Sequence, residues 1–311
     1  MKKLVVITIA LCMILGAFSM NNVSNVEAAS AKYEYISFYN NTTRKYAKEI
    51  KNGKFYFRYR NSKMQVKKGK NGKYKTIPAK FTGANGIAVN DGNVIFIENK
   101  NGVSTLKMFT FSNGKVKSLN KLPKSACKKT KYNKKYESCH ITGAYGSYIF
   151  FCSYNSSIAH EGSVMYSYNL KNNKYKKAGL TGQAEEETSG KFFVAAERWR
   201  TDDRTLAYNL YKFSNNGTVK KIKNITQNSF EVKIYDGSIY WIDCDKRNNP
   251  ESTSVLHSMK LNGTDEKILF TETDEFTIDR ITSIENGIIV IEDINHENSY
   301  KYNINTGEIS K

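Results

Sequence analysis

Ile234-Tyr-Asp-Gly-Ser-Ile-Tyr-Trp-Ile-Asp243 contains an Asp-Gly turn followed by a strand that is almost wholly apolar. Asp-Gly beside apolar runs is a strong signal for a β-hairpin, because the turn needs positive φ at its central residues. The same unit, a turn glycine before an apolar strand, occurs six times at intervals of 39 to 54 residues. The other copies are Gly53-Lys-Phe-Tyr-Phe57, Gly92-Asn-Val-Ile-Phe-Ile97, Gly146-Ser-Tyr-Ile-Phe-Phe151, Gly190-Lys-Phe-Phe-Val194 and Gly287-Ile-Ile-Val-Ile291.

Each copy is followed by a second turn signal. These turns are Lys70-Asn71-Gly72, Ser112-Asn113-Gly114, Lys171-Asn172-Asn173, Asn215-Asn216-Gly217, Leu261-Asn262-Gly263 and Asn305-Thr306-Gly307. Strands on both sides of the two turns give four strands per unit. Units of about 45 residues with four strands each are typical of β-propellers. We therefore predict an all-β, six-bladed β-propeller with four antiparallel strands per blade, or seven blades if the segment 33–39 adds a closing strand.

The composition agrees with one folded domain of this kind. The chain has 311 residues, 40% of them hydrophobic and 13% aromatic, so it can bury a large core. A large β-sandwich and a solenoid are the alternative architectures for such a series of strands. We expect a single propeller domain over residues 30–311.

The fifth unit also resembles a known repeat. Its Tyr240-Trp-Ile-Asp243, followed by Leu261-Asn-Gly-Thr264, is similar to the Tyr-Trp-Thr-Asp repeat of lipoprotein-receptor propellers with its Leu-Asp-Gly-Ser hairpin. It resembles still more closely the secreted bacterial propellers of unassigned function that are related to the TolB-like class. The resemblance implies a six-bladed fold and a binding scaffold, and it carries over no functional residues.

The first 29 residues have the layout of a secretory signal peptide. Lys2 and Lys3 precede an apolar run, residues 4–18, and small residues at Ala28 and Ala29 fit a cleavage site. An uncleaved membrane anchor is the alternative. No later segment has the ~20 apolar residues of a membrane span. We expect a secreted, extracellular protein that associates with the cell envelope and has no membrane span after cleavage.

Positive charge is concentrated in the first third of the chain. Residues 32–136 hold 26 Lys or Arg and four acids, whereas residues 137–311 hold 20 and 24. Such a sector attracts polyanions. The predicted polyanion-binding residues are Lys63, Lys67, Lys68, Lys70, Lys73, Lys75, Lys128, Lys129, Lys131, Lys134 and Lys135. Export favours an anionic cell-envelope polymer, or an extracellular protein or glycan, over specific nucleic acid. A lysine-rich surface that serves only solubility is the alternative.

Four cysteines follow the signal peptide, at positions 127, 139, 152 and 244. A hairpin in which Ala144 faces Ser147 would place Cys139 opposite Cys152, close enough for a disulfide. Export would allow such a bond to persist. The alternatives are a Cys127–Cys139 bond and buried thiols.

Sequence motifs for catalysis are missing. The histidines, His140, His160, His257 and His296, lack metal-ligand spacing, and no cofactor or metal is expected. We predict a monomeric, non-catalytic binding module. The alternative function is a propeller hydrolase or lactonase with a metal in its channel. Acidic residues scattered along the sequence could bind such a metal without forming a recognisable motif.

Overall fold

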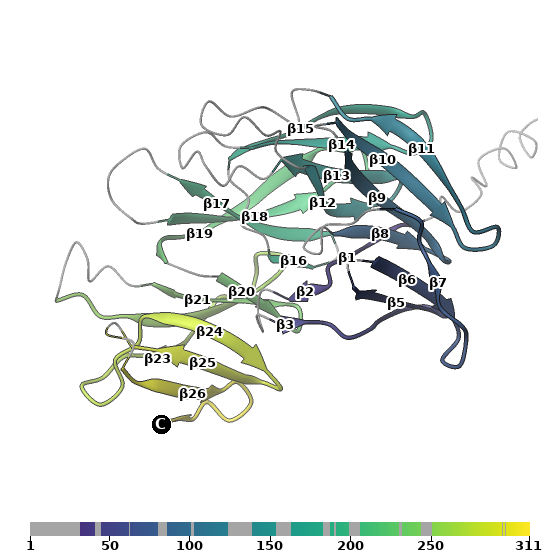
Figure 1. The fold of residues 1–311 in the computed structure, drawn as a ribbon. Helices are drawn as coiled ribbons and strands as arrows, with labels where there is room; N and C mark the ends of the chain where they lie inside the picture. The colour runs from purple at the N-terminus through teal and green to yellow at the C-terminus, as the bar shows by residue number, and fades with distance from the viewer. Residues whose placement is uncertain are drawn as a thin grey trace, which may run out of the picture. The chain divides into compact units, whose positions relative to one another are not determined.

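The described part of the computed structural model consists of residues 32–40, 45–61, 63–79, 86–100, 103–123, 139–153, 163–182, 187–189, 191–198, 206–229, 232–243, 251–293, 295 and 297–311. Every regular element in these ranges is a β-strand (Figure 1). No helix in these ranges is long and apolar enough to cross a membrane. The predicted signal peptide, residues 1–29, lies outside them.

Among the described residues, six antiparallel sheets of four or five strands follow one another. The first contains β4 (Ile50–Asn52), β5 (Phe55–Arg60), β6 (Lys63–Lys68) and β7 (Lys75–Thr76). The second contains β8 (Ile87–Asn90), β9 (Asn93–Lys100), β10 (Val103–Thr110), β11 (Lys115–Lys121) and, beside β8, β1 (Glu34–Ile36). The third contains β12 (Cys139–Tyr145), β13 (Tyr148–Ser153), β14 (Ser163–Asn169) and β15 (Lys174–Gly182).

The second half of the chain repeats the arrangement. The fourth sheet contains β16 (Glu187–Ser189), β17 (Phe192–Arg198), β18 (Leu206–Phe213) and β19 (Val219–Ser229). The fifth contains β20 (Val232–Tyr235), β21 (Ser238–Asp243), β22 (Val255–Lys260) and β23 (Lys267–Thr271). The sixth contains β24 (Arg280–Glu285), β25 (Ile288–Glu292), β26 (Ser299–Asn303) and β27 (Ile309–Ser310). A separate pair joins β2 (Tyr39–Asn40) to β3 (Lys45–Tyr46).

The prediction of an all-β chain with four antiparallel strands per unit is confirmed. In each sheet the strands lie side by side in chain order, which is the organisation of a propeller blade. The segment 33–39 does not add a strand to the sixth sheet: its strand β1 pairs with β8, where Glu34 faces Val89 and Ile36 faces Ile87.

Five hydrophobic clusters join consecutive sheets, from the first to the sixth. Phe57 and Phe96 belong to the cluster between the first and second sheets, and Phe150 and Phe213 to the cluster between the third and fourth. The strand after the turn glycine is buried on both faces where its sheet lies between two others. In β9 the four residues 94–97 are all buried, as are residues 239–242 in β21.

The first and sixth sheets differ from the others. In β5 the buried side chains Phe55 and Phe57 alternate with the half-buried Tyr56 and Arg58. In β25 the buried residues likewise alternate with half-buried ones. Successive side chains of a strand point to opposite faces, so one face of the first sheet packs against the second sheet and the other points outward.

Candidate polyanion-binding face

The outward face of the first sheet carries polar, basic and aromatic side chains, and we name it the basic face. Strand pairing aligns its residues, because Tyr56 lies opposite both Lys51 and Lys67, Arg58 opposite Gln65, and Arg60 opposite Lys63. Gln65 also lies opposite Thr76, to which its amide donates a hydrogen bond of 3.0 Å. The basic face consists of Lys51, Tyr56, Arg58, Arg60, Lys63, Gln65, Lys67 and Thr76.

A connected set of contacts orders the centre of the basic face. The Arg58 guanidinium carbon lies 3.7 Å from the centroid of the Tyr74 ring, and its Nε donates to Gln65 Oε1 at 2.7 Å. Lys67 Nζ lies 4.7 Å from the same ring and 3.0 Å from Glu49 Oε2, which also accepts the Tyr74 hydroxyl. Cation–π contacts at such exposed sites contribute about 0.5–1 kcal/mol each. The network therefore holds Arg58 in place and neutralises Lys67.

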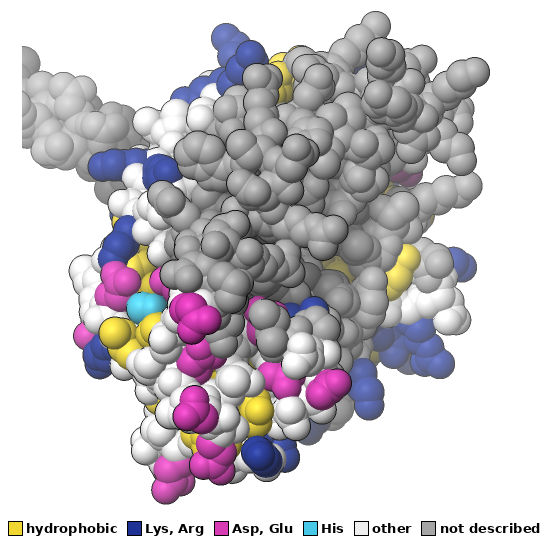
Figure 2. Space-filling view, turned by 90° about the vertical axis from the view of Figure 1, so that its left-hand side faces the viewer, with side chains coloured by type: hydrophobic (Ala, Val, Ile, Leu, Met, Phe, Trp, Pro, Cys, Tyr) yellow, Lys and Arg dark blue, Asp and Glu magenta, His cyan; other side chains and the backbone are white. Residues whose placement is uncertain are grey.

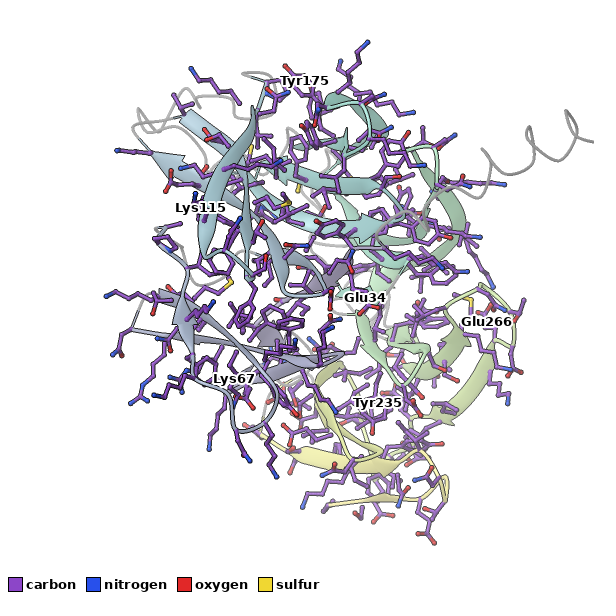
Figure 3. All side chains as sticks on the ribbon, turned by 90° about the vertical axis from the view of Figure 1, so that its right-hand side faces the viewer. Glu34, Lys67, Lys115, Tyr175, Tyr235 and Glu266 are labelled. Carbon is purple, nitrogen blue, oxygen red and sulfur yellow. The ribbon has the colours of Figure 1, made fainter. Side chains whose placement is uncertain are left out.

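The structure divides the predicted polyanion-binding lysines into groups. Lys63 and Lys67 lie on the basic face, as shown for Lys67 in Figure 3. Lys70 and Lys73 are exposed in the connection between β6 and β7. Lys68 and Lys75 lie on the opposite side of their strands, because they pair with Phe55 and Val66. The remaining five, Lys128, Lys129, Lys131, Lys134 and Lys135, fall outside the described residues.

Sequence reasoning missed Arg58, Arg60 and Lys51. The signal that could have found the two arginines is the alternation in Phe55-Tyr-Phe-Arg-Tyr-Arg60, in which each arginine follows an apolar position. The other middle strands, such as residues 94–97, are apolar at consecutive positions. A strand that alternates within a series of uniformly apolar strands indicates a sheet with one uncovered face.

The opposite end of the chain has a different charge. Residues 232–311 hold 15 acidic and 8 basic residues. Figure 2 shows acidic side chains gathered in the lower half of its view. By contrast, residues 50–79 hold ten basic residues and no acid. The first sheet therefore belongs to a strongly basic part of the chain, and the last two sheets belong to an acidic part.

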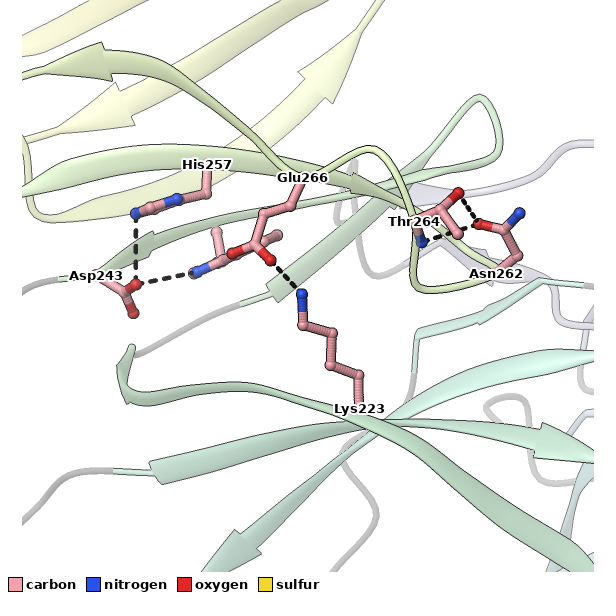
Figure 4. Close-up of polar contacts among 7 residues, drawn as sticks. Lys223, Asp243, His257, Asn262, Thr264 and Glu266 are labelled. Carbon is pink, nitrogen blue, oxygen red and sulfur yellow. Dashed lines mark hydrogen bonds and ion pairs between the residues drawn. The ribbon is translucent and has the colours of Figure 1, made fainter.

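One further polar cluster lies on the fifth sheet. His257 Nε2 is 3.4 Å from Asp243 Oδ2 (Figure 4). The His257 ring stacks on that of Trp241, with the centroids 5.1 Å apart. Trp241 donates its indole N–H to the same carboxylate at 3.3 Å. Within the described ranges, no three His, Cys, Asp or Glu side chains gather as a metal ion would require.

The predicted disulfide between Cys139 and Cys152 is wrong. Cys139 is disulfide-bonded, but Cys152 is outside any disulfide and its Sγ lies 3.6 Å from His140 Nε2. The turn consists of Gly146 and Ser147 alone, so Tyr145 faces Tyr148. A bulge between Ile141 and Gly143 then shifts the register by one residue. Consequently Cys139 faces Ser153, and Cys139 and Cys152 point to opposite sides of the sheet.

We expect non-reduced peptide mapping to link Cys139 to a cysteine other than Cys152. The alternative partner raised by the sequence, Cys127, lies outside the described residues. Cys152→Ser should leave the linked peptide unchanged, because its thiol is no part of the bond. A Cys139–Cys152 peptide in the digest would contradict the observed register.

Comparison with known proteins gives a likeness of fold only. No protein-family model matches the chain, and no curated protein matches it. The propeller domain of the Trilobed protease from Pyrococcus furiosus is 11% identical, covering 85% of this chain and 83% of that one at a TM-score of 0.45. TolB from Acinetobacter baumannii is 10% identical, and the match covers 91% of this chain and 63% of TolB at a TM-score of 0.37. The strand pairing and packing of this chain define its architecture.

Proposed function

We propose that this protein is a secreted, monomeric, six-bladed β-propeller that acts as a non-catalytic binding module for an anionic cell-envelope polymer. The observation that carries the proposal is the basic face. There, Lys51, Arg60 and Lys63 are exposed, and neither they nor Arg58 form an ion pair within the described ranges. Their charges are therefore available to an anionic ligand.

The fixed positions of side chains on the basic face favour ligands that carry oxyanions. A guanidinium has a planar fork of donors that matches phosphate and carboxylate groups. Because Arg58 is already held by Gln65 and by the Tyr74 ring, it loses little conformational freedom when a ligand binds. Binding by several such cations releases counterions from the polymer and is strongly weakened by salt.

The test is a salt series of binding to purified cell envelopes, with the unchanged protein and the variant Arg58→Gln, Arg60→Gln, Lys63→Gln. We expect the variant to bind about tenfold more weakly at low salt. The slope of log affinity against log salt should fall by about 2–3, because each lost phosphate contact removes about 0.7–0.9.

A matched control removes three positive charges elsewhere, with Lys260→Gln, Lys267→Gln and Lys301→Gln on the fifth and sixth sheets. It should bind as the unchanged protein does. Equal losses in both variants would mean that net charge acts without the basic face. Salt-independent binding would indicate a specific protein or glycan partner, and no binding at low salt would leave the hydrolase or lactonase as the function to test.

A further inference from the structure

Lysines recur on the outermost strands of the second, third and fourth sheets. The strands β11, β15 and β19 contain no acidic residue. We name six of their exposed lysines the lysine track: Lys115, Lys117, Lys174, Lys176, Lys177 and Lys220. Four of these six lie beyond residue 137, where the chain as a whole is slightly acidic. Total charge along the sequence therefore does not reveal the track.

The lysines occupy equivalent places in their sheets. In each sheet they follow the last hairpin turn, at residues 111–114, 170–173 and 214–218. Because each sheet is an antiparallel meander with the same strand order, these hairpins lie at the same end of every sheet. Lys115 and Tyr175, labelled in Figure 3, lie on two successive members of this series of strands, β11 and β15.

Contacts between sheets link the hairpins that precede the lysines. The hairpin of each sheet touches the sheet before it. Lys75 Nζ donates to Phe111 O at 3.1 Å, Asn120 Nδ2 to Asn173 O at 3.3 Å, and Ser167 Oγ to Gly217 O at 2.6 Å. The hairpins that precede these lysines thus follow one another from sheet to sheet, beginning beside the first sheet.

The track lacks compensating charge. None of its six lysines forms an ion pair with a described residue. Lys220 lies directly opposite Lys212 in the β18–β19 pairing, an arrangement of like charges that destabilises a sheet. Lysines on edge strands also prevent aggregation, but that role does not require two of them face to face.

The track ends at the fifth sheet. Glu266 there forms an ion pair with Lys223 of β19 (Figure 4). Asp265 lies 3.1 Å from Lys260 Nζ and 3.5 Å from Lys267 Nζ. The hydrogen bond from Lys260 lowers the pKa of Asp265, so this carboxylate stays charged and neutralises its neighbours. The six lysines of the track therefore lie on the second to fourth sheets, and the series stops where acids appear.

We propose that the lysine track binds a long, flexible polyphosphate-type polymer that passes from the first sheet across the second, third and fourth sheets. Lysine ammonium groups are point charges without the directional fork of arginine, so they recognise charge density and tolerate a mobile chain. The inference rests on the proposed function in that the ligand is a polyanion. It adds that chain length decides affinity, since a short chain reaches only one part of the track.

The experiment compares inorganic polyphosphate of about 10 and about 100 phosphates, since each neutralised phosphate adds to affinity and to its salt dependence. The variants are Lys174→Gln, Lys176→Gln, Lys177→Gln for the track, the basic-face triple variant above, and the control triple variant on the fifth and sixth sheets. We expect the track variant to lose about tenfold in affinity for the long chain and little for the short chain. The basic-face variant should lose affinity for both chains.

The outcomes separate the two proposals. A track variant that binds the long chain as the unchanged protein does, while the basic-face variant does not, would overturn the track and leave the proposed function standing. The lysine-track proposal would also be overturned if the unchanged protein bound long and short chains with equal affinity per chain. If the unchanged protein binds neither chain at low salt, both proposals fail. Circular dichroism of each variant confirms that the sheets are intact.

Discussion

Truncation of Phe213 to alanine is expected to lower the free energy of unfolding by about 3–5 kcal/mol. Phe213 is fully buried between the third and fourth sheets. Its ring centroid lies 4.3 Å from that of Phe150 and 4.6 Å from that of Phe193. On a further side the ring meets the bare backbone of Gly143, where an added Cβ would lie 2.3 Å away. Removing the ring therefore leaves a cavity that these neighbours cannot fill.

Urea denaturation followed by circular dichroism measures this loss. The matched control is Tyr175→Ala, which removes an aromatic ring that is 40% exposed on β15. It should change the free energy of unfolding by less than about 1 kcal/mol. Similar losses in the two variants would show that the third and fourth sheets do not pack as described.

The second large effect is expected at Gly92, in the turn between β8 and β9. Gly92 has a φ of +78°, and a Cβ placed on it would lie 2.5 Å from the Phe55 ring of the first sheet. Gly92→Ala should therefore cost about 1–2 kcal/mol for the left-handed backbone and a further ~1–3 kcal/mol for displacing the ring. Because Phe55 belongs to the cluster that joins the first two sheets, the variant should also weaken the proposed binding of an anionic polymer at the basic face.

Gly237→Ala separates the two costs. Gly237 occupies the same turn position before β21 with a φ of +75°, but nothing lies within 4 Å of its added Cβ. It should show the backbone cost alone, measured by the same denaturation experiment. Equal losses at Gly92 and Gly237 would mean that the first sheet does not pack closely against that turn.

Most of the strand architecture could be predicted from the sequence, because turns and strands depend on local chemistry. Gly53, Gly92, Gly146, Gly237 and Gly287 all have the positive φ that the turn signal requires. The exact register of β12 against β13 could not be predicted. It depends on a bulge between Ile141 and Gly143, and Gly143 has no side chain because Phe213, from the next repeat, occupies that space. The two-residue turn Gly146-Ser147 and this bulge together place Cys139 opposite Ser153 instead of Cys152.

The sequence predicted the positive charge of the candidate site but not all of the residues that form it. The excess of lysine in residues 32–136 predicts a basic surface, and Lys63 and Lys67 do lie on the basic face. Alternation alone gives two faces to each strand and does not say which one is covered. The second sheet covers the side that carries Phe55 and Phe57, so Arg58 and Arg60 face outward while Lys75 turns to Phe111.

The sequence by itself determined the repeat, its four strands and its turn positions, since these follow from residues that are close together in the chain. Only the tertiary structure decided which face of the first sheet stays uncovered and which lysines stand in one series. Lys115, Lys174 and Lys220 belong to separate repeats. Their alignment depends on hairpins that contact the preceding sheet, and such contacts leave no pattern in any single stretch of sequence.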